Sequence, residues 1–226
     1  MLRGARFSKE LVDVETIREF AKTISQIIDF RSKFTATHSS GVAAVAMELS
    51  SMSGFSGREC KMMEIAGFLH DLGKVAVPNE ILEKPGALNA LEFNLIRKHS
   101  YYTYVVLNKI RGLEQIAVWA SHHHERPDGN GYPFHVKDSD FSKLSRIMAV
   151  ADVVTALTED RPYRKGMDKS STLAILKNMA DSNTIDRGIV DLASENFAHI
   201  NDLRMNVQHA ERKEYDAFFR SLDNQN

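Results

Sequence analysis

The sequence has a single cysteine, only five prolines and almost no net charge. With Cys60 alone no intramolecular disulfide can form, and a reducing cytoplasm is the expected location. A formal charge of -1 provides no global field that would recruit nucleic acid polymers or anionic lipid, so a phosphate-bearing ligand must be held locally. The apolar runs are far shorter than the roughly 20 residues of a membrane helix, and the first residues lack the apolar core of a signal peptide.

Strand-like alternation and internal repeats are also missing, and the apolar residues follow helical spacing instead. Ser56 with Glu59, and Asn89 with Glu92, have the spacing of helix N-terminal capping boxes. We therefore predict an all-α fold, a single-domain helical bundle, which 226 residues suffice to build. The predicted helices cover residues 9–31, 37–49, 56–72, 89–99, 113–122, 144–157, 170–180 and 187–198, with Gly73 as a helix stop and a surface helix from Asp202.

Histidine, by contrast, is abundant: there are nine, and three are consecutive at residues 122–124. Glu125 follows them, and then a loop with Gly129, Gly131 and Pro133. Imidazole is the commonest nitrogen ligand for a transition metal, and glycines let a backbone come close to whatever the metal holds. The stretch therefore predicts a metal site with a substrate rim, and a second cluster at residues 70–74, His-Asp-Leu-Gly-Lys, strengthens that prediction.

The candidate ligands lie at or near the ends of five predicted helices: His38, His70, Asp71, His99, His123, His124 and Asp152. Ligands dispersed in this way can meet only in the core of a bundle. Two first-row metals would share them, each with about five or six positions to fill, and Asp71, the carboxylate beside a histidine, is the natural bridge. A donor set without thiolate suits iron, manganese or zinc, and the sequence does not choose among them.

Each candidate also has a structural interpretation. A histidine at a helix end, such as His38 or His99, is more often a cap or a hydrogen-bonded surface group. Asp152 is harder to explain in this way, because its apolar surroundings would bury a carboxylate that then needs a partner charge or a metal. For His122 we favour a structural role, with the orientation of a ligand as the alternative. For Glu125 we favour an orienting acceptor or a loop anchor over a ligand.

Three cations could meet a phosphate. Lys74 follows Asp71 by three positions and could neutralise a non-bridging phosphate oxygen, although an ordinary solvated lysine is the alternative. Arg161 and Arg164 flank Pro162 and Tyr163 and offer two guanidinium groups for phosphate or a guanine edge. The alternative for both arginines is a cation cluster at a helix C-terminus.

Taken in order, these motifs resemble the HD-GYP family, a subgroup of the HD metal-dependent phosphohydrolases. The resemblance runs from about His38 to Phe197. Its motifs are His70-Asp71-Leu72-Gly73-Lys74, Lys84-Pro85-Gly86, His99, His123-His124-Glu125, Asp128-Gly129-Asn130-Gly131-Tyr132-Pro133, Ala151-Asp152 and Arg161-Pro162-Tyr163-Arg164.

The resemblance implies a phosphodiesterase with two or three metals that hydrolyses cyclic di-GMP to linear pGpG, to GMP or to both. It implies attack by a metal-bridging hydroxide and stabilisation of the phosphoryl oxygens by the metals and Lys74. By the family pattern, one metal would take His38, His70, Asp71 and Asp152, and its neighbour would share Asp71 and add His99, His123 and His124. The residues implied to meet substrate are Lys74, Gly131, Tyr132, Pro133, Arg161 and Arg164.

The sequence departs from the family pattern in three places. Phe34 stands where members with three metals have a glutamate, which favours two metals, with iron or manganese preferred over zinc. Where many members follow His99 with a proline and then a glycine, Ser100 and Thr103 stand among Tyr101, Tyr102 and Tyr104, and bulkier residues near the site could narrow it or alter the ligand. Residues 135–138, His-Val-Lys-Asp, replace a glycine-leucine-x-glycine rim after the loop.

We expect three segments: an N-terminal helical extension at 1–33, the catalytic domain at 34–200 and a C-terminal helical tail at 201–226. No receiver or sensor domain fits before residue 33, so the terminal helices are the expected contact for a second copy or a regulatory partner. Three alternatives stay open: a hydrolase of another cyclic dinucleotide such as cyclic GMP-AMP or of a simpler nucleotide, a non-catalytic metal- and nucleotide-binding signalling module, and a dimetal oxygenase. The loop and Lys74 favour phosphate chemistry over oxidation.

Overall fold

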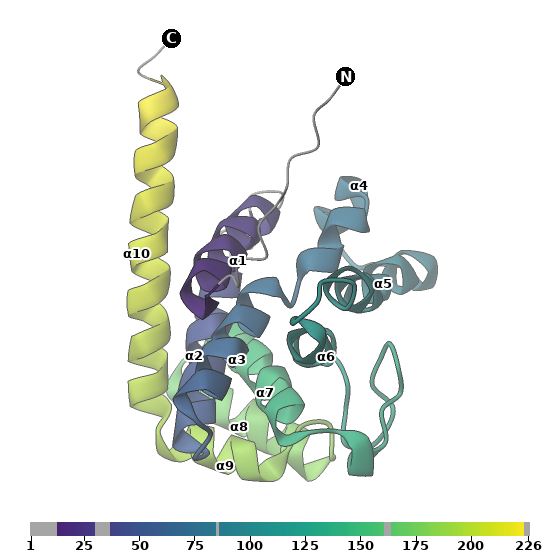
Figure 1. Cartoon of the computed structure of the whole chain (residues 1–226). Helices are drawn as coiled ribbons and strands as arrows, with labels where there is room; N and C mark the ends of the chain where they lie inside the picture. The colour runs from purple at the N-terminus through teal and green to yellow at the C-terminus, as the bar shows by residue number, and fades with distance from the viewer. Residues whose placement is uncertain (1–12, 30–36, 85, 161–163, 224–226) are drawn as a thin grey trace.

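The computed structural model describes residues 13–29, 37–84, 86–160 and 164–223, and every regular element in those ranges is a helix (Figure 1). The predicted all-α class is therefore confirmed. No helix in these ranges is both long and apolar enough to cross a membrane. The elements are α1 (Val14–Asp29), α2 (His38–Met52), α3 (Gly57–Leu69), η1 (Leu72–Ala76), α4 (Asn79–Leu82), α5 (Ala90–Leu107), α6 (Glu114–Ser121), η2 (Asp138–Asp140), α7 (Lys143–Thr158), α8 (Lys169–Asp181), α9 (Arg187–Glu195) and α10 (Phe197–Asp223).

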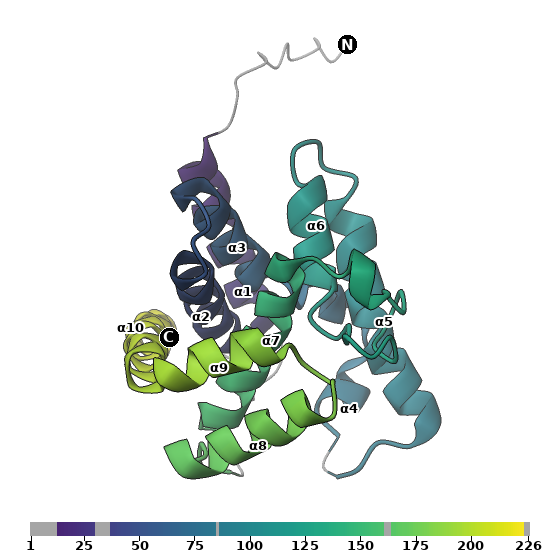
Figure 2. The ribbon, with the colours of Figure 1, turned by 90° about the horizontal axis from the view of Figure 1, so that it is seen from below.

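The core forms around α2, α3 and α7. Helix α2 is apolar on nearly every side, and Val42, Val45 and Leu49 have no exposed surface. Ile147 and Met148 of α7 are buried as completely. A helix with apolar residues on every face is stable only when other parts of the protein cover those faces. The neighbouring helices do so in this fold. Figure 2 shows α5 and α6 on one side of this centre, α8 and α9 on another, and α10 next to α2.

Two helix starts form as the sequence predicts. The Glu59 N–H donates to Ser56 Oγ at 3.3 Å, and the Ser56 N–H donates back to Glu59 Oε2 at 2.9 Å. Asn89 and Glu92 make the same reciprocal pair at the start of α5. Each pair satisfies backbone donors that a helix leaves free at its first turn.

Two predicted helix ends are wrong. Helix α3 ends at Leu69, not at Leu72, and Gly73 lies inside the following 3-10 turn rather than acting as a helix stop. A Cβ atom on Gly73 would lie 1.9 Å from the His99 carbonyl oxygen, so its glycine permits the close contact of η1 with α5. Helix α5 continues past His99 to Leu107.

The terminal helices pack on the bundle. Helix α1 contacts α3, and the Arg18 guanidinium binds both carboxylate oxygens of Glu64 at 2.7 and 2.8 Å. The tail was predicted to be a surface helix from Asp202, but α10 begins at Phe197 and buries Arg204 and Gln208 against α2 and the end of α7. The charged composition of this segment suggests an exposed helix. Its polar side chains can nevertheless be buried, because they are hydrogen bonded.

The close approach of α2 and α3 depends on Gly67. A Cβ atom there would lie 2.5 Å from the Ala43 Cα atom and 2.8 Å from the Ala43 nitrogen, both in the backbone.

We expect Gly67→Ala to lower the free energy of unfolding by about 1–3 kcal/mol through overpacking, measured by urea denaturation. Gly57→Ala is the matched control. Its Cβ meets nothing within 4 Å at the first residue of α3, so stability there should stay equal or rise. Equal stabilities for the two variants would contradict this packing argument.

Candidate metal centre

The structure brings all seven predicted metal ligands together in the core. Their donor atoms form three overlapping groups, and within each group the atoms lie within 4.8 Å of one another. His70 and His123 each belong to two groups, so the groups form one continuous centre. The groups are His99, His123 and His124; His38, His70 and Asp152; and His70, Asp71 and His123.

Asp71 lies between the imidazoles, just after the end of α3. Its Oδ2 atom is 3.1 Å from His70 Nε2, and its Oδ1 atom is 3.3 Å from His99 Nε2. Burial by itself would raise the pKa of Asp71, but His70 and Lys74 outweigh burial and hold that pKa well below its ordinary value. An ionised carboxylate with its two oxygens facing different imidazoles has the arrangement of a bridging ligand.

Three of the histidines are oriented by the same local contact. The Nδ1 atoms of His70, His99 and His123 lie 2.8, 2.6 and 2.7 Å from the carbonyl oxygens of the residues three positions earlier. A carbonyl oxygen only accepts, so each Nδ1 carries the proton and donates it. In His99 and His123, whose pKa values burial lowers, Nε2 is thereby left with a lone pair that faces the centre. His70 Nε2 instead contacts Asp71 Oδ2 at 3.1 Å, and Asp71 outweighs burial and raises the pKa of His70.

These two lone pairs oppose each other. The Nε2 atoms of His99 and His123 are 3.0 Å apart, and burial is the main reason that the pKa of each ring is lowered. Burial likewise lowers the pKa of His124 to about 3. Two neutral imidazole nitrogens whose lone pairs face each other in a buried site require a cation or a shared proton between them. This donor set fits a divalent first-row metal.

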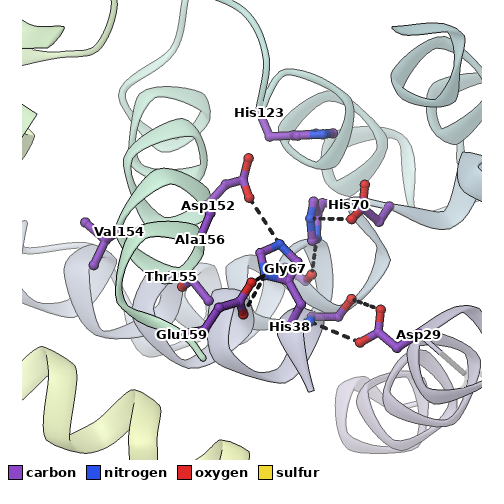
Figure 3. A network of polar contacts seen from close by, with 12 residues as sticks. Asp29, His38, Gly67, His70, His123, Asp152, Val154, Thr155, Ala156 and Glu159 are labelled. Atoms are coloured by element: carbon purple, nitrogen blue, oxygen red, sulfur yellow. Dashed lines mark hydrogen bonds and ion pairs between the residues drawn. The ribbon is translucent and has the colours of Figure 1, made fainter. Parts of the chain in front are cut away.

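Glu159 is a residue of the centre that the sequence analysis missed. Its carboxylate oxygens accept from His38 Nδ1 at 3.0 and 3.1 Å, while His38 Nε2 lies 3.2 Å from Asp152 Oδ1. Figure 3 shows the His38 ring between these two carboxylates. Glu159 follows Asp152 by seven positions, about two helical turns, so this spacing was the available signal.

The His38 contacts also set the local charge. Burial would lower the pKa of His38, but Glu159 and Asp152 outweigh burial and hold that pKa well above its ordinary value. Burial would raise the pKa of Asp152, yet the hydrogen bond from His38 keeps it far below the ordinary range. Without a metal, His38 is therefore the cation that compensates two buried carboxylates.

Helix α10 supports Glu159 from behind. The Gln208 side-chain amide donates to Glu159 Oε2 at 3.3 Å and to the Thr37 carbonyl oxygen at 3.0 Å. Arg204 donates to the Gln208 side-chain oxygen and to the Thr158 carbonyl oxygen. The start of α2 and the end of α7, which supply His38 and Asp152, are thus held by one buried hydrogen-bond network.

Ser100 and Thr103, which depart from the family pattern, join α5 to the centre. The Ser100 hydroxyl donates to His99 Nε2 at 3.2 Å. Thr103 Oγ1 accepts from the Gly73 N–H at 2.9 Å and donates to the His70 carbonyl oxygen at 3.0 Å. Both side chains are completely buried; Thr103 joins α5 to η1, whereas the Ser100 contact stays within α5.

The loop after residues 122–124 is anchored by Glu125. Its carboxylate accepts the backbone N–H groups of Phe134 and Val136 at 2.6 and 3.0 Å, which confirms the loop-anchor interpretation. A Cβ atom on Gly131 would lie 2.4 Å from backbone atoms of Glu125 and Arg126, so Gly131 lets the loop close tightly. The Tyr132 ring then lies 4.7 Å from the His124 ring.

The lysine and arginine side chains that were predicted to meet a phosphate lie in different surroundings. Lys74 Nζ lies 2.5 Å from Asp71 Oδ2, beside the centre. Arg164 donates to the Ala156 carbonyl oxygen at 2.7 Å, which is the helix C-terminal contact considered as its alternative role. Arg161 lies outside the described residues, as does Phe34. His122 packs against Phe134 and Phe141 and lies 3.4 Å from the Ser145 hydroxyl.

Comparisons with known proteins agree with this geometry. A model of the HD domain family matches residues 22–189. The chain is 35% identical over 195 residues to the 3'3'-cGAMP-specific phosphodiesterase 1 of Vibrio cholerae, a match that covers 86% of this chain and 45% of that protein. It is 39% identical over 152 residues to a cyclic di-GMP phosphodiesterase of Pseudomonas aeruginosa, covering 67% of this chain and 36% of that protein.

A solved structure has a similar fold. An HDG"Y"P protein from Bdellovibrio bacteriovorus superposes with a TM-score of 0.58 at 15% identity, over 84% of this chain and 64% of that one. At this identity the likeness concerns the fold alone. The chain spans less than half the length of the two curated relatives.

The contact of Glu159 with His38 predicts a role in metal affinity. We expect Glu159→Ala to weaken Mn²⁺ binding about 10- to 100-fold, because His38 loses the acceptor that fixes its proton on Nδ1. The measurement is calorimetric titration of the metal-stripped protein. Glu211→Ala is the control, since Glu211 is equally buried but pairs with Lys22 of α1. A folded Glu159→Ala protein with normal affinity would rule out the orienting role.

Proposed function

This chain belongs to the HD domain family, and on that premise we propose that it is a metal-dependent phosphodiesterase that hydrolyses cyclic di-GMP to linear pGpG, to GMP or to both. The observation that carries the proposal is Asp71. Its carboxylate faces His70 with one oxygen and His99 with the other, at the middle of seven potential ligands. We infer a pair of divalent ions, with Asp71 shared between them.

The ligand sets that we propose follow the grouping of the donor atoms. His38, His70 and Asp152 would hold one ion, and His99, His123 and His124 would hold the other. Imidazole and carboxylate donors suit iron or manganese, and they also suit zinc. The bound ions would supply Lewis acidity toward phosphoryl oxygens and would lower the pKa of a water molecule.

Side chains around the ions would stabilise charge on the substrate and position it. The Lys74 ammonium lies beside Asp71, where it can neutralise charge on a non-bridging phosphoryl oxygen. Burial would lower the pKa of Lys74, but Asp71 outweighs burial and raises it, so the ammonium stays charged. Tyr132 lies next to His124, Pro133 lines the adjoining cleft, and both would position the dinucleotide.

A second candidate substrate is cyclic GMP-AMP. The relative named for 3'3'-cGAMP is 35% identical over 86% of this chain, a broader match than the one to the cyclic di-GMP enzyme of Pseudomonas aeruginosa. Both substrates present the same phosphodiester to the metal centre and differ in one base. Residues that contact the bases therefore decide between them.

The test of the proposal combines metal analysis with a hydrolysis assay. We expect purified protein to contain close to two divalent ions per chain and to convert cyclic di-GMP to products that chromatography separates. Asp71→Ala should lose both metal and turnover, because the shared carboxylate is removed. A variant that keeps its full metal content and normal turnover would refute the bridging role.

Lys74 should separate catalysis from metal binding. We expect Lys74→Ala to keep its metal but to lose a factor on the order of 10²–10³ in kcat, the usual effect of removing one charge-stabilising donor. Lys61→Ala, at an exposed lysine of α3, is the control. Unchanged kcat in Lys74→Ala would leave the lysine only an ion-pairing role with Asp71.

A further inference from the structure

A cleft of about 480 Å³ lies beside the metal centre, between α5 and the loop that follows residues 122–124. Its walls combine aromatic rings with cations. Helix α5 contributes Arg97, Lys98, Tyr101 and Tyr102, and the loop contributes Tyr132 and Pro133. Tyr132 belongs both to this cleft and to the metal centre, since its ring lies 4.7 Å from the His124 ring. A ligand whose phosphate reaches the metals could therefore extend directly into the cleft.

Arg97 is held in place by stacking. Its guanidinium carbon lies 4.4 Å from the centre of the Tyr132 ring and 5.8 Å from the centre of the Phe93 ring. The ion pairs found among the described residues do not include Arg97. A guanidinium stacked on a ring keeps the N–H groups at its edge available for a ligand. Arg97 therefore offers a planar, oriented set of donors at the wall of the cleft.

The tyrosines of α5 offer ring faces. Tyr101 is 49% exposed and Tyr102 is 37% exposed, and their rings meet edge to face with centroids 6.0 Å apart. Tyr101 also approaches the Phe134 ring of the loop, at 6.3 Å. Exposed aromatic rings grouped around a cleft are a feature of ligand-binding grooves, and their faces are open to a flat partner. Nucleobases stack on tyrosine rings and on guanidinium planes in this way.

We propose that this cleft is a purine-binding subsite selective for guanine, in which Tyr101 stacks on the base and Arg97 binds its O6 and N7 edge. The donors of Arg97 match the two acceptors of guanine, whereas adenine presents an amino donor at the same edge. The assignment rests on the proposed function, because it places one base of the cyclic dinucleotide while its phosphate lies at the metals. It makes Arg97 a specificity-determining residue of that reaction.

The first test uses nucleotides that have no phosphodiester bond and so cannot be turned over. Calorimetry of the metal-loaded protein should give tighter binding of GMP than of AMP. Arg97→Ala should remove most of that preference, a change of about 5- to 150-fold. Arg97→Lys should not restore the preference, since an ammonium lacks the fork of donors. Full restoration of the GMP preference by lysine would show that one charged donor suffices and would overturn the two-point contact of Arg97 with guanine. Equal losses of GMP and AMP binding in Arg97→Ala would reduce that contact to a charge on phosphate.

Tyr101 should behave differently from Arg97. Tyr101→Ala should weaken GMP and AMP about equally, by about tenfold, because stacking tolerates any base, and Tyr101→Phe should bind as the wild type does. Arg111→Ala and Phe20→Ala are the matched controls, an exposed arginine and an exposed aromatic residue outside the cleft. A loss confined to GMP in Tyr101→Ala, or equal losses in the controls, would contradict the arrangement.

Steady-state hydrolysis separates this inference from the proposed function. With cyclic di-GMP, Arg97→Ala should raise KM by about tenfold or more and should change kcat less. A normal KM in Arg97→Ala, with active wild-type protein, overturns the subsite alone. If the wild-type protein hydrolyses no cyclic dinucleotide but binds GMP in an Arg97-dependent way, the subsite stands and the proposed function fails.

Discussion

The convergence of imidazole rings on one buried space is the constraint on which the rest of the structure depends. His70, His99 and His123 each donate from Nδ1 to a carbonyl oxygen of the preceding helical turn, so their Nε2 atoms face inward. Burying unpaired acceptors is costly unless a cation compensates them. In the protein alone, protonated His38 and Lys74 compensate the carboxylates, while the His99 and His123 nitrogens oppose each other. The fold thus holds a set of imidazole nitrogens and carboxylate oxygens that bound cations would stabilise.

Much of the fold and of this centre could be predicted because the relevant information is local in the sequence. The capping boxes and the apolar stripes need only neighbouring residues, and the histidine and aspartate motifs identified all seven side chains that the structure brings together. The errors lie where tertiary contacts decide. Gly73 has the sequence context of a helix stop, yet its glycine is required by the approach of α5. Glu159 stands in a polar stretch, and only the path of α2 brings it to His38.

Two positions that depart from the family pattern contact the residues of the centre through hydroxyl groups. In place of a proline and a glycine, Ser100 and Thr103 bind His99, Gly73 and His70 through their hydroxyl groups. Both are buried beneath the centre, and the exposed rings of Tyr101 and Tyr102 project from the same helix toward the cleft. Thr103 joins α5 to η1, Ser100 contacts the His99 ring, and the two tyrosines line the outer wall.

The hydrogen bonds between α10 and the end of α7 bear on where the C-terminal boundary of the domain lies. Gln208 and Arg204 satisfy the Thr37 and Thr158 carbonyl oxygens, and Gln208 also reaches the carboxylate that orients His38. A fragment that stopped at the end of α9 would uncover three acceptors at once, two of them on the backbone of helices that carry ligand side chains. The domain boundary expected at residue 200 thus falls inside α10, ahead of the two side chains that make these contacts.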